Sequence, residues 1–174
     1  MLMRVALLGV LIGAAACAAA PRQRPIPMGP VDTGPKSLTA ARQYLHGRWS
    51  LESFEVYPPG RPPIRLTGSG TLNYDEFGNL RIDIRTDEKT ADLLRQAGIE
   101  TNGGVLSSDG RTVIDLQNQT LTYVVEGQPA AEMSSGPLGL NRPRHWQVEG
   151  NLLTLTTKDD QDKAVSVGRW RKVE

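Results

Sequence analysis

The side chains that could carry out chemistry are few in this sequence, and they lie far apart. The chain has two histidines, His46 and His145, and one cysteine, Cys17. Neither histidine has a cysteine or carboxylate at the spacing of a metal site. No Ser-His-Asp or Cys-His arrangement is indicated, because Cys17 lies outside the main domain. We therefore predict a protein that is not an enzyme and that uses no metal ion or other cofactor.

Two short motifs have the composition of ligand loops but are better explained by structure. Asp159–Asp162 is the densest acidic run, but Lys158 and Lys163 flank it and the glycine of a calcium loop is missing. Gly68-Ser69-Gly70 lacks the following helix of a phosphate-binding loop. We interpret the acidic run as a hairpin tip, and the glycines as positions that ease the curvature of a strand.

The position of Cys17 indicates modification rather than catalysis. Arg4 is followed by Val5–Ala16, an apolar run shorter than the roughly 20 residues of a membrane-spanning helix. This pattern predicts an export signal over residues 1–16. The small residues before Cys17 resemble the bacterial lipobox, in which the cysteine becomes the new N-terminus and carries a diacylglycerol thioether. The alternative is an ordinary secretory signal that is cut beyond Cys17.

The lipobox resemblance implies a place for the protein in the cell envelope. Acyl chains anchor a protein because each buried methylene group contributes about 0.8 kcal/mol. No acidic residue follows Cys17 directly, which in bacteria with two membranes fits retention in the outer membrane. We expect a covalent lipid anchor at the periplasmic face of the outer membrane or, with an ordinary signal, a soluble periplasmic or secreted protein.

Composition divides the rest of the chain into a linker and one domain. Residues 17–36 are rich in proline and poor in large apolar residues, which predicts a disordered linker. Residues 37–174 have the size of one domain with one core. Charge is balanced, with 20 Lys and Arg against 19 Asp and Glu. Because no basic stripe occurs, nucleic acid is not an expected partner.

A period of two dominates residues 37–174 and predicts antiparallel strands. Leu80, Ile82 and Ile84 alternate with charged residues, and Ile64–Tyr74 has apolar residues or glycine at every second position. Turn residues predict three hairpins, at Asp75–Asn79, Ser108–Gly110 and Glu149–Asn151. Further strands are expected over Thr112–Leu116, Leu121–Val125, Trp146–Leu155 on both sides of the last turn, and Val165–Val173.

Two short helices interrupt the strands. The first is expected over Ser37–Leu45, with Ser37 or Thr39 as its N-cap, and the second begins after Thr86 or Asp87 and ends at Gly98. Eight to nine strands with short connections bury one face most economically by closing into a barrel, which also removes exposed edges. We therefore predict an all-β, up-and-down antiparallel barrel, with an open sandwich as the alternative.

Motifs near both ends of the domain resemble lipocalin-like barrels. Gly47-Arg48-Trp49 opens the first strand, and Gly168-Arg169-Trp170-Arg171 lies in the last. The Tyr74–Leu80 hairpin and Leu153–Leu155 are also similar to bacterial lipocalin-like domains. The resemblance implies a barrel in which Arg169 or Arg171 covers Trp49 through a cation–π contact.

The alternation also selects side chains that face the barrel interior: Leu66, Leu72, Tyr74, Leu80, Ile82, Ile84, Tyr123 and Val125. A barrel of about eight strands is either filled by such side chains or holds one ligand. The first case predicts a structural lipoprotein that docks an envelope protein. The second predicts a non-catalytic binder of a small apolar or amphipathic molecule, with these residues as its binding site.

The two functions differ in what they require at the barrel mouth. Gly127–Pro143 is long for a loop and has apolar residues at Met133, Leu138 and Leu140. We expect it either to fold these residues over the mouth or to form a surface loop. A pocket of several hundred Å³ would favour the binder, and a packed interior would favour the interaction protein.

Overall fold

The computed structural model describes residue 34 and residues 36–124, 138–139 and 142–173. The predicted export signal, the lipidation site Cys17, nearly all of the linker, Val125, Met133 and Leu140 lie outside these described residues. Within them, no helix has the length and apolar character needed to cross a membrane.

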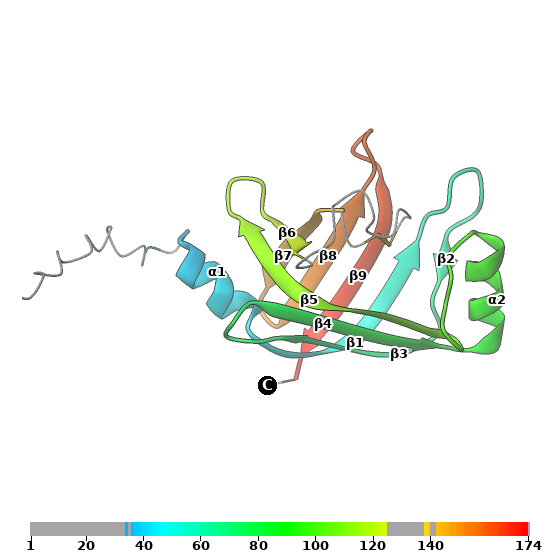
Figure 1. The fold of residues 1–174 in the computed structure, drawn as a ribbon, viewed down its shortest axis with the longest axis horizontal. Coiled ribbons are helices and arrows are strands. Elements are labelled where there is room, and N and C mark those ends of the chain that lie inside the picture. The colour runs from blue at the N-terminus through cyan, green and yellow to red at the C-terminus, as the bar shows by residue number, and fades with distance from the viewer. Residues whose placement is uncertain (1–33, 35, 125–137, 140–141, 174) are drawn as a thin grey trace, which may run out of the picture. The chain divides into compact units, whose positions relative to one another are not determined.

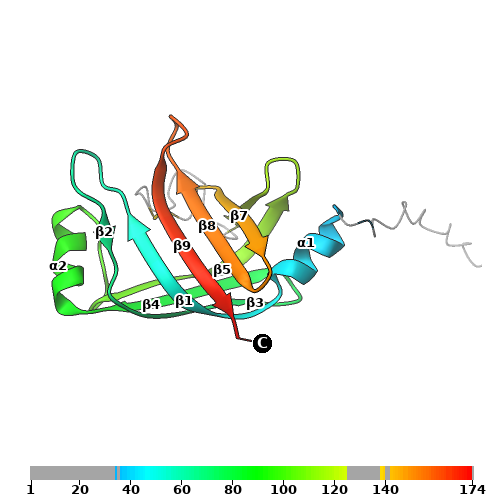
Figure 2. The same cartoon turned by 180° about the vertical axis from the view of Figure 1, so that it is seen from behind.

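The described residues form nine strands and two helices (Figures 1 and 2). In chain order they are α1 (Leu38–Leu45), β1 (Gly47–Val56), β2 (Ile64–Arg65), β3 (Gly68–Tyr74), β4 (Asn79–Thr86), α2 (Glu88–Gln96), β5 (Val105–Asp115), β6 (Thr120–Val124), β7 (Arg144–Glu149), β8 (Leu152–Lys158) and β9 (Ala164–Lys172). All neighbouring strands are antiparallel, and β1 pairs with β3 on one side and with β9 on the other. The sheet is therefore a closed barrel of eight strands, with β2 as an addition beside the end of β1. The up-and-down barrel is confirmed, and the open sandwich is excluded.

Local sequence signals fix both helices as expected. The Ser37 hydroxyl accepts a hydrogen bond from the Ala40 amide at 3.0 Å and begins α1. The Asp87 carboxylate accepts one from the Thr90 amide at 2.7 Å and begins α2, and Gly98 follows that helix with a φ of 75°. The two helices lie at opposite ends of the barrel (Figures 1 and 2).

Two predicted features of the strands are wrong. Ile64–Tyr74 is not one strand, because the chain leaves the ladder between β2 and β3. Gly68 then passes so close to β4 that a Cβ there would lie 1.9 Å from the Arg85 carbonyl oxygen. Ser108–Gly110 is not a turn but the middle of β5. Gly110 serves packing, since a Cβ at this position would lie 3.1 Å from the Tyr123 ring.

The other two predicted hairpins and the acidic tip are confirmed. The turn between β3 and β4 has Gly78 at a φ of 86°, and the turn between β7 and β8 has Gly150 at 60°. Asp159 lies at the tip between β8 and β9, where its carboxylate accepts hydrogen bonds from the amides of Gln161 and Lys163, both at 2.9 Å.

The register of β1 against β9 shifts once, between Leu51 and Ser53. Before the shift, Leu51 lies opposite Trp170. After it, Phe54 lies opposite Gly168, and Val56 lies opposite Ser166. A strand normally alternates its faces at every residue. The shift is a bulge that lets odd-numbered residues face inward in the first half of β1 and even-numbered residues in the second half.

The α1 end of the barrel is filled by side chains. Its most deeply buried residues are Leu45, Trp49, Leu72, Tyr74, Leu80 and Leu153, each at most 2% exposed. The indole of Trp49 donates a hydrogen bond to the Leu45 carbonyl oxygen at 3.0 Å, which ties the end of α1 to the first strand. This end is therefore a closed, packed core.

The cation that covers Trp49 is Lys172, and the expectation that Arg169 or Arg171 covers it is wrong. The Lys172 ammonium lies 5.1 Å from the centre of the Trp49 ring. Lys172 pairs directly with Trp49 in the sheet, so both side chains lie on one face. The two arginines occupy the alternate, outward positions of β9, where Arg171 forms an ion pair with Glu52.

Candidate functional site

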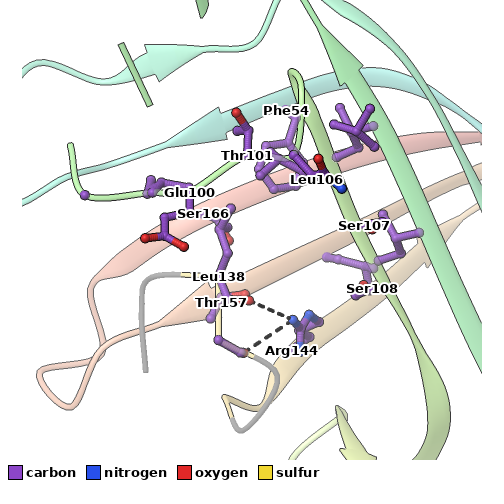
Figure 3. Close-up of a pocket in the computed structure, with 18 of the residues that line it drawn as sticks. Phe54, Glu100, Thr101, Leu106, Ser107, Ser108, Leu138, Arg144, Thr157 and Ser166 are labelled. Carbon is purple, nitrogen blue, oxygen red and sulfur yellow. Dashed lines mark hydrogen bonds between the residues drawn. The ribbon is translucent and has the colours of Figure 1, made fainter. Parts of the chain in front are cut away.

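A cavity of about 720 Å³ occupies the opposite end of the barrel, beside the segment that follows α2 (Figure 3). Its apolar wall is formed by side chains of five strands: Phe54, Ile82, Ile84, Leu106, Leu155 and Trp170. Residues 98–102 form part of the rim, and Leu138 and Gly139 lie against the wall. The lining also includes the polar side chains of Ser108, Arg144, Thr157 and Ser166.

Strand register brings the polar side chains together. Arg144 of β7 pairs with Thr157 of β8, which in turn pairs with Ser166 of β9. Residues that pair directly across antiparallel strands project to the same face at nearly the same height. All three side chains therefore face the interior in one row, and all three are buried.

Arg144 is the one charged side chain among the described residues that is buried, with 7% of its surface exposed. Its guanidinium donates hydrogen bonds to the backbone carbonyl oxygens of Gly139 at 3.4 Å and Leu138 at 3.5 Å (Figure 3). It donates a third to the carbonyl oxygen of Arg142 at 3.1 Å. It also lies 4.8 Å from the centre of the Tyr123 ring. Carbonyl dipoles and an aromatic face therefore surround the charge.

No carboxylate of the described residues forms an ion pair with Arg144, since the ion pairs found there join other side chains. Burial lowers the pKa of Arg144 from its ordinary value, but an arginine in a protein keeps its proton at neutral pH. Removing such a charge from water costs several kcal/mol unless an anion compensates it. The cavity therefore contains a positive charge that its described surroundings stabilise only in part.

Tyr123 holds the guanidinium from the other side. Its hydroxyl lies 2.9 Å from the Ser108 hydroxyl, close enough for a hydrogen bond. Burial raises the pKa of Tyr123, so the phenol stays neutral and presents its ring face to the Arg144 cation. A neutral ring stabilises a cation without neutralising it.

Of the eight predicted binding residues, Ile82 and Ile84 line the cavity. Five others are buried in the surrounding core without lining it: Leu66, Leu72, Tyr74, Leu80 and Tyr123. Val125 lies outside the described residues. Leu138, from the segment expected either to cover the mouth or to form a surface loop, lines the cavity and packs against the core.

The sequence reasoning missed the polar half of the site. Arg144 has the same parity as Trp146 and Val148, both of which pack against the core, so alternation along β7 was the available signal. The interior positions of β5 were missed because Ser108–Gly110 was interpreted as a turn. Both omissions concern residues whose role depends on neighbouring strands.

The remaining polar candidates do not gather into a second site. His46 ends α1, and His145 lies next to Arg144 on the alternate face of β7. Within the described part of the chain, no three His, Cys, Asp or Glu side chains lie close enough to hold a metal ion. No family model and no curated protein matches the chain. Its function is therefore argued from the geometry of the cavity.

Proposed function

We propose that this protein is a lipid-anchored, non-catalytic binding protein of the cell envelope, with a lipocalin-like barrel that holds one small apolar or amphipathic molecule. The cavity of about 720 Å³ is the observation that carries this proposal. Pockets for small molecules have volumes of roughly 300–1,000 Å³, mostly apolar walls and a few polar groups that fix orientation. The lining of this cavity combines an apolar wall with polar side chains that include Arg144, Thr157 and Ser166.

The alternative, a structural lipoprotein that docks an envelope partner, needs a barrel filled from end to end. The α1 end meets that requirement, with Trp49 and Leu45 almost fully buried. The other end does not, because the inward side chains of Ile82, Ile84 and Leu155 border open space. The cavity therefore favours the binding function.

A fluorescence titration tests the binding function. N-phenyl-1-naphthylamine is neutral and apolar and brightens in a dry pocket, so saturable binding of one molecule is expected. Leu106→Trp places a bulkier side chain in the cavity and should weaken binding, since Leu106 lines it. Val113→Trp is the matched control, because Val113 lies on the same strand but is 57% exposed. Absence of saturable binding, or equal loss in both variants, would contradict the proposal.

The small residues before Cys17 support the proposed anchor. Cys17→Ser removes the thiol that would carry the diacylglycerol, so the variant should leave the membrane fraction. The thermal melt of the barrel should not change, which separates loss of the anchor from loss of the fold. A Cys17→Ser protein that stays on the membrane would disprove lipidation. Native mass spectrometry of the wild type from its own membrane should show the added lipid mass and any retained ligand.

A further inference from the structure

The buried Arg144 guanidinium faces the cavity and has no carboxylate partner among the described residues. Given the proposed binding function, this cation indicates the chemical class of the ligand. Arginine has five N–H donors in a planar fork, and its bonds to three carbonyl oxygens are all 3.1 Å or longer. Charge-assisted bonds to an anion are shorter, at about 2.7–2.9 Å. The fork therefore has capacity for a stronger acceptor.

Neighbouring hydroxyl groups extend this polar spot. Thr157 pairs with Arg144 and Ser166 pairs with Thr157, and all three side chains line the cavity. Figure 3 shows Thr157 beside Arg144, with Ser166 farther along the same wall. Hydroxyl groups donate hydrogen bonds to oxyanions. The row can therefore surround an acidic headgroup on more than one side.

Another part of the wall fits an apolar chain. Ile82, Ile84 and Leu155 line the cavity with Trp170 and carry no charge. A charged group at one point of a pocket that also has an apolar wall fixes the orientation of an amphipathic molecule. We propose that Arg144 binds the carboxylate of a monoanionic amphipath whose apolar chain occupies the cavity.

Charge selects a carboxylate over a phosphate monoester. A phosphate monoester carries nearly two negative charges at neutral pH, and Arg144 neutralises one. A second charge on the headgroup would therefore be left uncompensated in a medium that screens poorly.

Displacement of N-phenyl-1-naphthylamine tests the proposal with three ligands that share one chain. Dodecanoate, 1-dodecanol and dodecyl phosphate are added below the concentrations at which they aggregate. Hydrogen bonds to a charged group correspond to a gain on the order of ten- to a hundredfold in affinity, so dodecanoate should bind more tightly than 1-dodecanol by that factor. Equal affinities would overturn the proposal, and tighter binding of dodecyl phosphate would overturn the choice of a carboxylate.

Arg144→Met keeps an unbranched side chain and removes the charge, so it should abolish the preference for dodecanoate while the neutral probe still binds. Arg169→Met is the matched control, since Arg169 is exposed on the outer face of β9. It should keep the full preference. A preference that survives in Arg144→Met, or that falls equally in both variants, would show that Arg144 is not the contact.

Two carboxylates outside the described residues, Glu126 and Glu132, give a second control. If one of them occupied Arg144, the preference for dodecanoate would be absent from the wild type and would emerge in the double variant Glu126→Gln/Glu132→Gln. That result would overturn the proposal. A wild type that binds the probe without preferring dodecanoate refutes this inference alone, whereas a wild type that binds no probe refutes the proposed function.

Discussion

The α1 end and the cavity end of the barrel are built from the same strands, yet the positive charge at each end has different surroundings. At the α1 end, Lys172 lies over Trp49 at the closing edge of a packed core. At the cavity end, Arg144 is 7% exposed and faces open space. The first cation adds to the stability of the fold. The second is held at a cost to stability, which is typical of groups that serve binding.

The largest expected effect comes from breaking the packed end. Trp49→Ala should lower the free energy of unfolding by about 3–5 kcal/mol, the usual loss when a buried large aromatic is truncated. Trp49→Phe should cost less, because it keeps most of the apolar volume. Chemical denaturation monitored by circular dichroism measures both values. A Trp49→Ala protein as stable as the wild type would mean that this end does not hold the barrel together.

The next effect distinguishes the cavity end by its response to ligand. Dodecanoate at a hundred times its dissociation constant should stabilise the wild type by about 2.7 kcal/mol, since a ligand that binds only the folded state shifts unfolding by mass action. Arg144→Met should show a much smaller shift at the same concentration. Thermal unfolding with and without dodecanoate measures the difference. Equal shifts in the two proteins would remove the distinction between the two cations.

A smaller effect is expected from the cation at the packed end. Lys172→Ala should cost about 0.5–2 kcal/mol, the range of a cation–π contact, and should couple to Trp49→Phe in a double-mutant cycle. Arg169→Ala and Arg171→Ala should not couple, because both side chains face outward. Coupling to either arginine would contradict the observed register of β1 and β9.

The smallest effect concerns the turn between β3 and β4, which adjoins the packed end at Tyr74. Burial raises the pKa of Asp75, but hydrogen bonds from Asn79, Phe77 and Gly78 outweigh it and hold the pKa below 3.8. A carboxylate whose pKa is lowered by folding stabilises the protein at every pH above the pKa of the unfolded state. This contribution is lost as the pH falls through the pKa of the folded state.

Asp75→Asn should therefore be less stable than the wild type at neutral pH, and the gap should narrow well below pH 3.8. Melting temperatures of the two proteins across this range provide the test. A gap that does not change with pH would show that the Asp75 charge makes no contribution.

The features that the sequence predicts are those that depend on near neighbours. Asp87 caps its helix through a residue three positions away, and Gly78 forms its turn within one hairpin, so both carry local signals. Gly110 has no such signal. A glycine that makes room for a ring on the next strand and a glycine that turns the chain look alike in sequence.

The cation over Trp49 and the polar row of the cavity depend on register between distant segments. Alternation alone does not determine whether the odd-numbered or the even-numbered residues of β9 face the barrel interior. Trp49 lies opposite Lys172 only because β1 and β9 meet at that register. Arg144 likewise lines the cavity because the pairing of β7 with β8 places it beside Thr157, on the inner face of the barrel. Its side chain does not fill the space there.

The bulge in β1 explains how one strand serves both ends. Before it, Trp49 and Leu51 face inward, and after it Phe54 and Val56 do so. The strand thus has two stretches of alternating inward and outward residues, with odd-numbered residues inward in the first and even-numbered residues inward in the second, joined by one extra residue. Deleting the extra residue between Leu51 and Phe54 would join the two stretches into one regular alternation, in which Leu51 and Phe54 both still face inward. What the bulge supplies is a local bend and stronger twist in β1 between the packed end and the cavity.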